Sequence, residues 1–200
     1  MKTAEEVRRS FFGKDPRSNR QRMLDGDIYF ADDPENARLA QRAVELTDAY
    51  YRATVAGDAG AVEILRELLG SLGAGSIIKP PLFVDYGENL HLGDDVFANF
   101  NLTALDVAPI WIGDRCQIGP NVQLLTPTHP LDGDLRGAGL EGAEPIVLGE
   151  NVWLGGGAIV CPGVTIGANS VIGAGAVVTR DVPEGVLAVG VPAKPIRSIE

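Results

Sequence analysis

The chain has few cysteines, few aromatic residues and a shortage of positive charge among its 200 residues. Two cysteines, Cys116 and Cys161, cannot build a disulfide framework, and the first residues contain no apolar stretch typical of a secretion signal. We therefore expect a reducing, cytoplasmic setting. The 17 basic and 27 acidic residues give a net charge of −10, which disfavours general binding to nucleic acid and to anionic membranes.

The sequence also lacks any charge over residues 151–179, a stretch long enough for a membrane-spanning helix. This stretch contains seven glycines, Pro162 and several polar residues, which interrupt it too often for a helix that faces lipid. We therefore expect no transmembrane segment.

The same stretch repeats with a period of six residues. Aliphatic residues stand at every sixth position, and glycine follows most of them: Leu148, Leu154, Val160, Ile166, Ile172 and Val178. Four positions after each stands a small or aliphatic residue, or a serine: Val152, Ala158, Val164, Ser170, Ala176 and Val182. The frame also appears upstream, at Leu92, Ile112, Ile118 and Leu124. A period of six is neither helical nor simple alternation, and it predicts an all-β solenoid with one short strand per repeat.

The first third of the chain is predicted to be helical. Thr3 and Glu6 have the spacing of a capping box, and Asp33 precedes Pro34 as a helix cap. Apolar residues then follow at helical spacing: Leu39, Ala43, Leu46 and Tyr50, and after them Val62, Leu65, Leu68 and Leu69, ending at Gly70.

Residues 125–145 break the repeat, which resumes in register at Leu148. This segment is rich in glycine and proline, as expected for a loop extruded from a solenoid, and long loops of this kind are usually functional. We therefore divide the chain into an N-terminal extension (1–18), a helical domain (19–75) and a solenoid (76–200) that carries loop 125–145 and a C-terminal tail.

Several segments resemble the hexapeptide-repeat acyltransferases, most of all the maltose, galactoside and nodulation-sugar O-acetyltransferases. MLDGDIYFADDPENARL resembles the helical domain of that group, and FVDYGENLHLGDDVFANFNLTALDVAPIWIGD, NVWLGGGAIVCPGVTIGANSVIGAGAVVTRDVP and GVPAKPIR resemble its repeats and closing motif. The resemblance runs from about Arg20 to Ile199. It implies a left-handed parallel β-helix with a small α-helical N-terminal domain, acetyl-CoA as co-substrate, no required metal, and a homotrimer with each active site between adjacent β-helices.

His129 is the expected catalytic base. Moving an acetyl group from a thioester to a sugar hydroxyl requires a base for the hydroxyl proton, and histidine suits this task because its ordinary pKa lies near neutrality. The run Thr126-Pro-Thr-His129-Pro130 resembles the catalytic loop of the family. The other histidine, His91, lies in a repeat strand and is interpreted as structural.

The remaining catalytic and acceptor residues are assigned through the resemblance. Asn99 matches the position whose amide stabilises the developing oxyanion, whereas Asn101 is interpreted as a corner residue. Carboxylates accept hydrogen bonds from sugar hydroxyls, so we expect Asp85, Asp106 and Asp32 to bind the acceptor.

The resemblance also implies which residues contact the coenzyme. Small residues let its pantetheine arm approach the backbone, and cations meet its phosphates. The matched positions are Trp153, Gly156, Ala174, Thr179, Arg180, Lys194 and Arg197.

The leading hypothesis is an O-acetyltransferase acting on a maltose-, glucose- or galactoside-like sugar by direct attack. Val107 stands where a galactoside-type acceptor carboxylate is expected, which disfavours galactosides. Three alternatives remain: an antibiotic or other xenobiotic acceptor, a zinc enzyme resembling the gamma-class carbonic anhydrases, and a noncatalytic β-helix scaffold. The helical domain disfavours the xenobiotic acceptor. The presence of only two histidines disfavours the zinc enzyme. The intact loop and the tail cations disfavour the noncatalytic scaffold.

Overall fold

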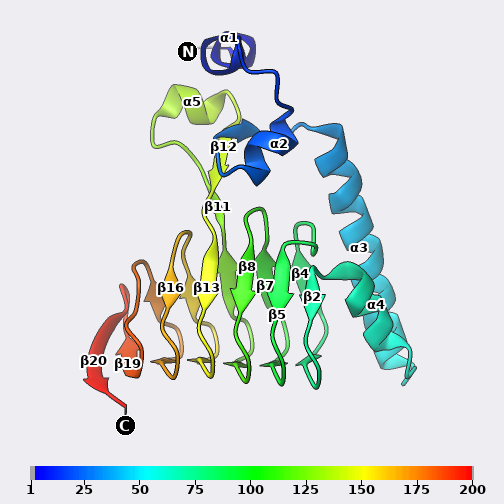
Figure 1. Ribbon diagram of the computed structural model, residues 1–200, viewed down its shortest axis with the longest axis vertical. Coiled ribbons are helices and arrows are strands. Elements are labelled where there is room, and N and C mark those ends of the chain that lie inside the picture. The colour runs from blue at the N-terminus through cyan, green and yellow to red at the C-terminus, as the bar shows by residue number, and fades with distance from the viewer. Residues whose placement is uncertain (1–2, 200) are drawn as a thin grey trace.

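A computed structural model of the chain describes residues 3–199 as a β-solenoid flanked by helices, with a loop rising from its side (Figure 1). The expected solenoid with a helical N-terminal region is confirmed. The helices are α1 (Ala4–Phe12), α2 (Asn19–Leu24), α3 (Pro34–Val55), α4 (Ala61–Leu68) and α5 (Gly133–Gly137). Helices α3 and α4 lie against the first coil of the solenoid.

The helices begin where their capping residues predict. Thr3 accepts a hydrogen bond from the Glu6 backbone N–H, and the Glu6 carboxylate accepts one from the Thr3 backbone N–H, so the capping box of α1 is confirmed. The Asp33 side chain caps α3 by accepting from the Glu35 N–H at 3.0 Å. Of the predicted apolar face of α3, Leu39, Ala43 and Tyr50 are buried.

Three sheets of stacked short strands form the faces of the solenoid. The seven-stranded sheet contains β3 (Ile77–Ile78), β6 (Phe97–Ala98), β9 (Gln117–Ile118), β14 (Trp153–Leu154), β17 (Val171–Ile172), β19 (Val186–Val189) and β20 (Lys194–Ser198). The β4–β18 sheet contains β4 (Leu82–Val84), β7 (Leu102–Leu105), β10 (Gln123–Leu125), β15 (Ile159–Val160) and β18 (Val177–Val178). The β2–β16 sheet contains β2 (Ser71–Leu72), β5 (Leu90–Leu92), β8 (Ile110–Ile112), β13 (Ile146–Leu148) and β16 (Thr165–Ile166).

All neighbouring strands of the solenoid pair in parallel except β19 and β20, which are antiparallel. The first solenoid strand, β2, begins at Ser71, slightly before the expected boundary at residue 76, and pairs with β5. The helical segment therefore leads directly into the first coil.

The six-residue repeat builds the core. The aliphatic residues of the frame from Leu148 to Val178 are each at most 1% exposed. Ser170 is also fully buried, and its hydroxyl donates to the Pro183 carbonyl at 2.7 Å. The glycine that follows most of these repeat residues permits close stacking, since a Cβ on Gly155 would lie 2.5 Å from the Ala174 nitrogen of the next coil.

The chain turns three corners in each coil, and two of them matter for the site. We call the turn from the seven-stranded sheet into the β4–β18 sheet the groove corner (residues 99–101, 119–122, 155–158 and 173–176). We call the turn from the β4–β18 sheet into the β2–β16 sheet the loop corner (residues 85–89, 106–109, 126–145, 161–164 and 179–181). Asn101 and Asn121 occupy the groove corner with positive φ, and the Asn101 amide donates to the Asn121 oxygen at 3.1 Å, as expected for a corner residue.

The extruded loop leaves the solenoid after β10 and returns at β13, as predicted, and it is itself structured. It contains β11 (Pro127–Thr128), α5 and β12 (Leu140–Ala143), and β12 pairs antiparallel with both β11 and β1 (Tyr29–Phe30). The helical region and the loop therefore share one small sheet.

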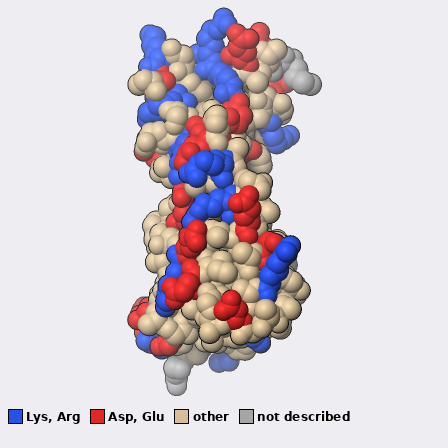
Figure 2. Space-filling view, turned by 90° about the vertical axis from the view of Figure 1, so that its right-hand side faces the viewer, with Lys and Arg blue, Asp and Glu red and all other residues tan. Residues whose placement is uncertain are grey.

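The surface carries both signs of charge in close alternation. Figure 2 shows Lys and Arg side chains interspersed with Asp and Glu side chains over the visible face, without a continuous basic patch. Among the described residues, no helix is both long and apolar enough to cross a bilayer.

Candidate functional site

A groove of about 530 Å³ runs over the outer face of the seven-stranded sheet and ends at the groove corner. Its lining includes four residues that sequence analysis assigned to the site: Asn99, Trp153, Gly156 and Ala174. The structure thus brings these residues, which lie far apart in the sequence, onto one surface.

The groove is mostly apolar along its floor and has polar donors at its corner. Phe97, Gln117, Trp153, Val171 and Leu187 are aligned in register across the strands, and all five line the groove. At the corner, the backbone N–H groups of Gly156 and Ala174 have no acceptor among residues 3–199. Such a surface suits a long, flexible ligand with an apolar chain and amide groups.

Asn99 presents a donor at the groove. Its side-chain oxygen accepts a hydrogen bond from the Phe100 N–H at 2.8 Å, so its NH₂ group remains as the donor that a ligand can use. This is the group that the proposed oxyanion role requires.

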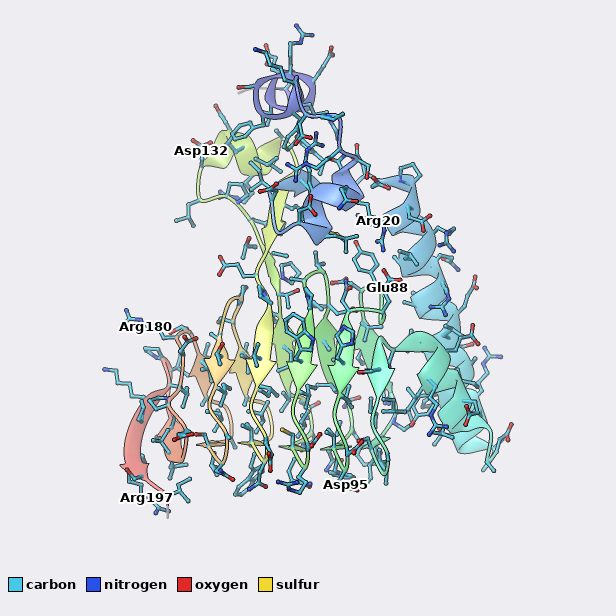
Figure 3. The ribbon with its side chains drawn as sticks, in the orientation of Figure 1. Arg20, Glu88, Asp95, Asp132, Arg180 and Arg197 are labelled. Atoms are coloured by element: carbon cyan, nitrogen blue, oxygen red, sulfur yellow. The ribbon has the colours of Figure 1, made fainter. Side chains whose placement is uncertain are left out.

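The tail cations lie beside this groove. Lys194 and Arg197 are exposed on β20, and Arg197 stands opposite the groove residue Leu187. Neither cation forms an ion pair within the described part of the chain. Thr179 and Arg180 lie elsewhere, at the loop corner, and Figure 3 shows Arg180 and Arg197 at opposite ends of the last coils.

His129 follows β11 on the extruded loop and is exposed. The loop base is anchored at Thr126, whose hydroxyl accepts from the Ala108 N–H at 3.0 Å and whose carbonyl accepts from the Glu144 N–H at 2.9 Å. His129 therefore belongs to the loop corner, whereas Asn99 belongs to the groove corner. The four residues of β7 that separate these corners span roughly 13 Å, so one chain does not bring His129 and Asn99 together.

Three carboxylates gather below the loop. Burial, together with the nearby charges of Asp106 and Glu141, raises the pKa of Asp85 to about 6. The Asp85 Oδ2 atom is buried and has no hydrogen-bond partner within the described residues. Glu141, from β12, accepts a hydrogen bond from the Tyr29 hydroxyl at 3.0 Å.

Asp106 is fully buried and faces the backbone of the loop corner. Its carboxylate accepts hydrogen bonds from the N–H groups of Asp85, Tyr86 and Asn89 at 2.9 to 3.1 Å. Burial raises the pKa of Asp106, and these hydrogen bonds oppose the rise. With 0% exposure, Asp106 positions Asp85 and does not itself face a ligand.

Asp32 does not join this cluster. Its carboxylate forms an ion pair with Arg8 and accepts a hydrogen bond from the Asn19 amide at 3.2 Å. Arg20 is another residue of the helical region that contacts the loop corner, where it pairs with Glu88 (Figure 3). Glu141 and Tyr29 were not predicted from the sequence, because only the pairing of β1 with β12 brings them together.

The remaining polar candidates have structural surroundings. His91 stacks on Trp111, with ring centroids 6.1 Å apart, in agreement with a structural role. Cys116 is fully buried and Cys161 partly so, and burial raises the pKa of both thiols, which disfavours a thiolate nucleophile. Within residues 3–199, no group of three or more His, Cys, Asp or Glu side chains is arranged to hold a metal ion.

Comparison with known proteins gives consistent matches over most of the chain. Residues 22–73 match the maltose acetyltransferase hexapeptide capping motif, and residues 145–180 match the bacterial transferase hexapeptide family of six repeats. Nodulation protein L of Rhizobium meliloti is 48% identical over 89% of this chain and 97% of its own.

Two of the solved structures that match share the fold over 92% of this chain. A maltose O-acetyltransferase from Clostridium difficile superposes with a TM-score of 0.90 and 41% identity, covering 92% of this chain and 98% of that one. A hexapeptide-repeat acetyltransferase from Vibrio cholerae, complexed with acetyl coenzyme A, has a TM-score of 0.85 and 38% identity, covering 92% and 100%.

Proposed function

The chain belongs to the hexapeptide-repeat acetyltransferases of the maltose, galactoside and nodulation group, and from this premise we propose that it moves the acetyl group of acetyl-CoA to a hydroxyl of a sugar. The observation that carries the proposal is the groove on the seven-stranded sheet, because it gathers an apolar floor, two free backbone N–H groups and the Asn99 donor. The pantetheine arm of the coenzyme is apolar with amide groups and fits such a lining, and Lys194 and Arg197 offer positive charge for its phosphates.

The proposed chemistry is a direct transfer. The acceptor oxygen attacks the thioester carbonyl while the His129 imidazole takes the hydroxyl proton, and the bond between carbonyl carbon and sulfur breaks. The proton then passes to the departing thiolate, which leaves as coenzyme A. The Asn99 amide donates to the carbonyl oxygen as negative charge develops on it, an interaction worth a few kcal/mol when well aligned.

Asp85 and Glu141 are the proposed acceptor contacts. They stand beside the loop that carries His129, and the buried Oδ2 atom of Asp85 has no hydrogen-bond partner within the described residues. A sugar with neighbouring hydroxyl groups suits two adjacent carboxylates, which accept hydrogen bonds from both.

We further propose a homotrimer in which each site forms between two copies. This is supported by the separation of His129 and Asn99 onto different corners, and by Leu131 beside His129, which is 97% exposed in the single chain. In such an assembly the loop corner of one copy, with His129, Thr179 and Arg180, meets the groove of the next.

Mixing variants tests this assembly. His129→Ala and Asn99→Ala trimers should each be impaired, but trimers refolded from a mixture of the two should regain activity at interfaces that combine both intact residues. An equal mixture of wild type and His129→Ala, refolded in the same way, serves as the reference for how much activity mixed assemblies recover. No recovery in the mixed trimers, or an active monomer in sedimentation, contradicts the shared site.

The function itself is tested with a panel of sugars. Acetyl-CoA is mixed with each sugar, and thiol release and the mass of the sugar product are measured, with His129→Ala as the matched control. We expect release that depends on at least one sugar and an acetylated product. Coenzyme binding without release for any sugar points to another acceptor class, and absence of coenzyme binding contradicts the proposal.

A further inference from the structure

Helix α1 precedes the family's capping motif in the chain. The matched capping motif begins at residue 22, whereas α1 spans Ala4–Phe12. The helix is nevertheless well formed, with its capping box at Thr3. It lies over α5 and the far end of the extruded loop (Figure 1).

A small apolar cluster joins α1 to the loop. Val7 of α1, Phe30 of β1 and Leu140 of β12 are each at most 2% exposed and pack together, with Leu135 and Ala138 of the loop against them. The Arg8 guanidinium lies 3.9 Å over the Phe30 ring. These apolar loop residues belong to this cluster and not to the solenoid core.

The loop elements seated on α1 hold the backbone on both sides of His129. Before it, Thr128 pairs with Gly142 of β12 in the small antiparallel ladder. After it, the Arg136 side chain of α5 donates to the Pro130 carbonyl at 2.8 Å and to the Leu131 carbonyl at 3.1 Å. Both restraints originate in α5 and β12, which are the elements that α1 covers.

We propose that α1 braces the loop and thereby positions His129 for proton transfer, with Val7 and Arg136 as positioning residues. The inference rests on the proposed function, because it takes His129 to be the base. Burial of Val7 fixes α5 and β12, and these in turn fix the residues before and after the imidazole. A loss of the brace leaves the coenzyme groove unchanged, because the groove lies on the seven-stranded sheet.

The test uses the full chain with Val7→Asn, which places a polar group in the cluster, and Arg136→Ala, which removes the two carbonyl contacts and leaves the cluster intact. Each should lower kcat about 10- to 100-fold, since a misplacement of about 1 Å can cost this much. The KM for acetyl-CoA should stay unchanged. Arg136→Lys should recover part of the loss because one carbonyl contact can be restored.

Two controls separate positioning from general destabilisation. Leu65→Ala removes buried apolar surface from α4, far from the loop, and should lower stability without lowering kcat. In the His129→Ala background, Val7→Asn should cause no further loss of kcat, because the brace acts only through the imidazole.

Amide hydrogen exchange gives a readout that does not depend on catalysis. Residues 133–143 should exchange faster in Val7→Asn, while the solenoid strands keep wild-type protection. Unchanged exchange in this segment, or a wild-type kcat in both Val7→Asn and Arg136→Ala, overturns the brace. An active His129→Ala variant overturns the proposed base instead, and the exchange result then still decides whether α1 restrains the loop.

Discussion

Replacing Asp85 with asparagine should stabilise the protein at neutral and alkaline pH. The carboxyl is held in a site where burial and the charges of Asp106 and Glu141 raise its pKa from 3.8 to about 6. Ionisation in this site therefore opposes folding, and Asp85→Asn removes the charge while keeping nearly the same shape.

The size of the effect follows from the pKa. A change from 3.8 to about 6 corresponds to about 3 kcal/mol. Because Asp85 is only partly buried, solvent screening reduces this value, and we take about 1.5 kcal/mol. For a chain of this length that is a rise in Tm of about 3–6 °C.

The sign of the pH dependence is fixed by linkage. Below pH 3.8 the carboxyl is protonated in both folded and unfolded states, and the charge costs nothing. The cost grows as the pH rises from 3.8 to about 6, because over this range the unfolded chain ionises the carboxyl while the folded protein keeps it protonated, and the cost is complete above about 6. The advantage of Asp85→Asn should therefore be complete near pH 8 and about half as large near pH 5.

The assay is thermal unfolding of the wild-type and Asp85→Asn proteins at equal concentration at the two pH values. A difference in Tm that is the same at both pH values refutes the electrostatic reasoning, because packing alone then accounts for it. A variant that is less stable near pH 8 refutes it more strongly. Loss of the carboxylate should also raise the KM for the sugar and leave the KM for acetyl-CoA unchanged.

Three further predictions address the coenzyme, the oxyanion and the core. Lys194→Ala and Arg197→Ala should each raise the KM for acetyl-CoA by about 10-fold or more, which is the effect of losing a charge-assisted phosphate contact. The control Arg52→Ala on α3 should leave this KM unchanged. A wild-type KM in both tail variants contradicts the phosphate contact. Asn99→Ala should lower kcat by about 10²- to 10³-fold, measured with saturating acetyl-CoA and sugar, and a near-normal kcat contradicts the oxyanion role of Asn99. Ile166→Ala should lower the free energy of unfolding by about 2–5 kcal/mol, measured by denaturant titration. Thr165 is the exposed neighbour, and Thr165→Ala should have a much smaller effect. Equal effects of the two substitutions contradict the conclusion that the repeat residues point into the core.

The solenoid was predictable because its stabilising contacts repeat locally. Each inward residue from Leu148 to Val178 meets its equivalents in neighbouring coils, so one period in the sequence fixes both the strand and its direction. The caps at Thr3 and Asp33 were likewise predictable, because a cap depends on residues within one turn of helix.

The parts that were not predicted depend on contacts between distant residues. Val7 packs against Leu140, and Tyr29 donates a hydrogen bond to Glu141. Both contacts depend on the pairing of β1 with β12, which no periodic pattern in the sequence predicts. Asp106 was expected among the acceptor contacts, yet its carboxylate turns inward to the backbone of the loop corner. The turn that follows a strand decides whether the next side chain points inward or outward. The amino-acid composition does not reveal this direction.

The central claim is that His129 takes the proton of a sugar hydroxyl during acetyl transfer. The most direct measurement is kcat for His129→Ala beside wild type, with acetyl-CoA binding measured on the same preparations and the oligomeric state verified by sedimentation. The account predicts a fall in kcat of roughly 10²- to 10⁴-fold and unchanged coenzyme affinity. A near-normal kcat in an intact trimer would contradict the mechanism and make His129 an ordinary loop residue.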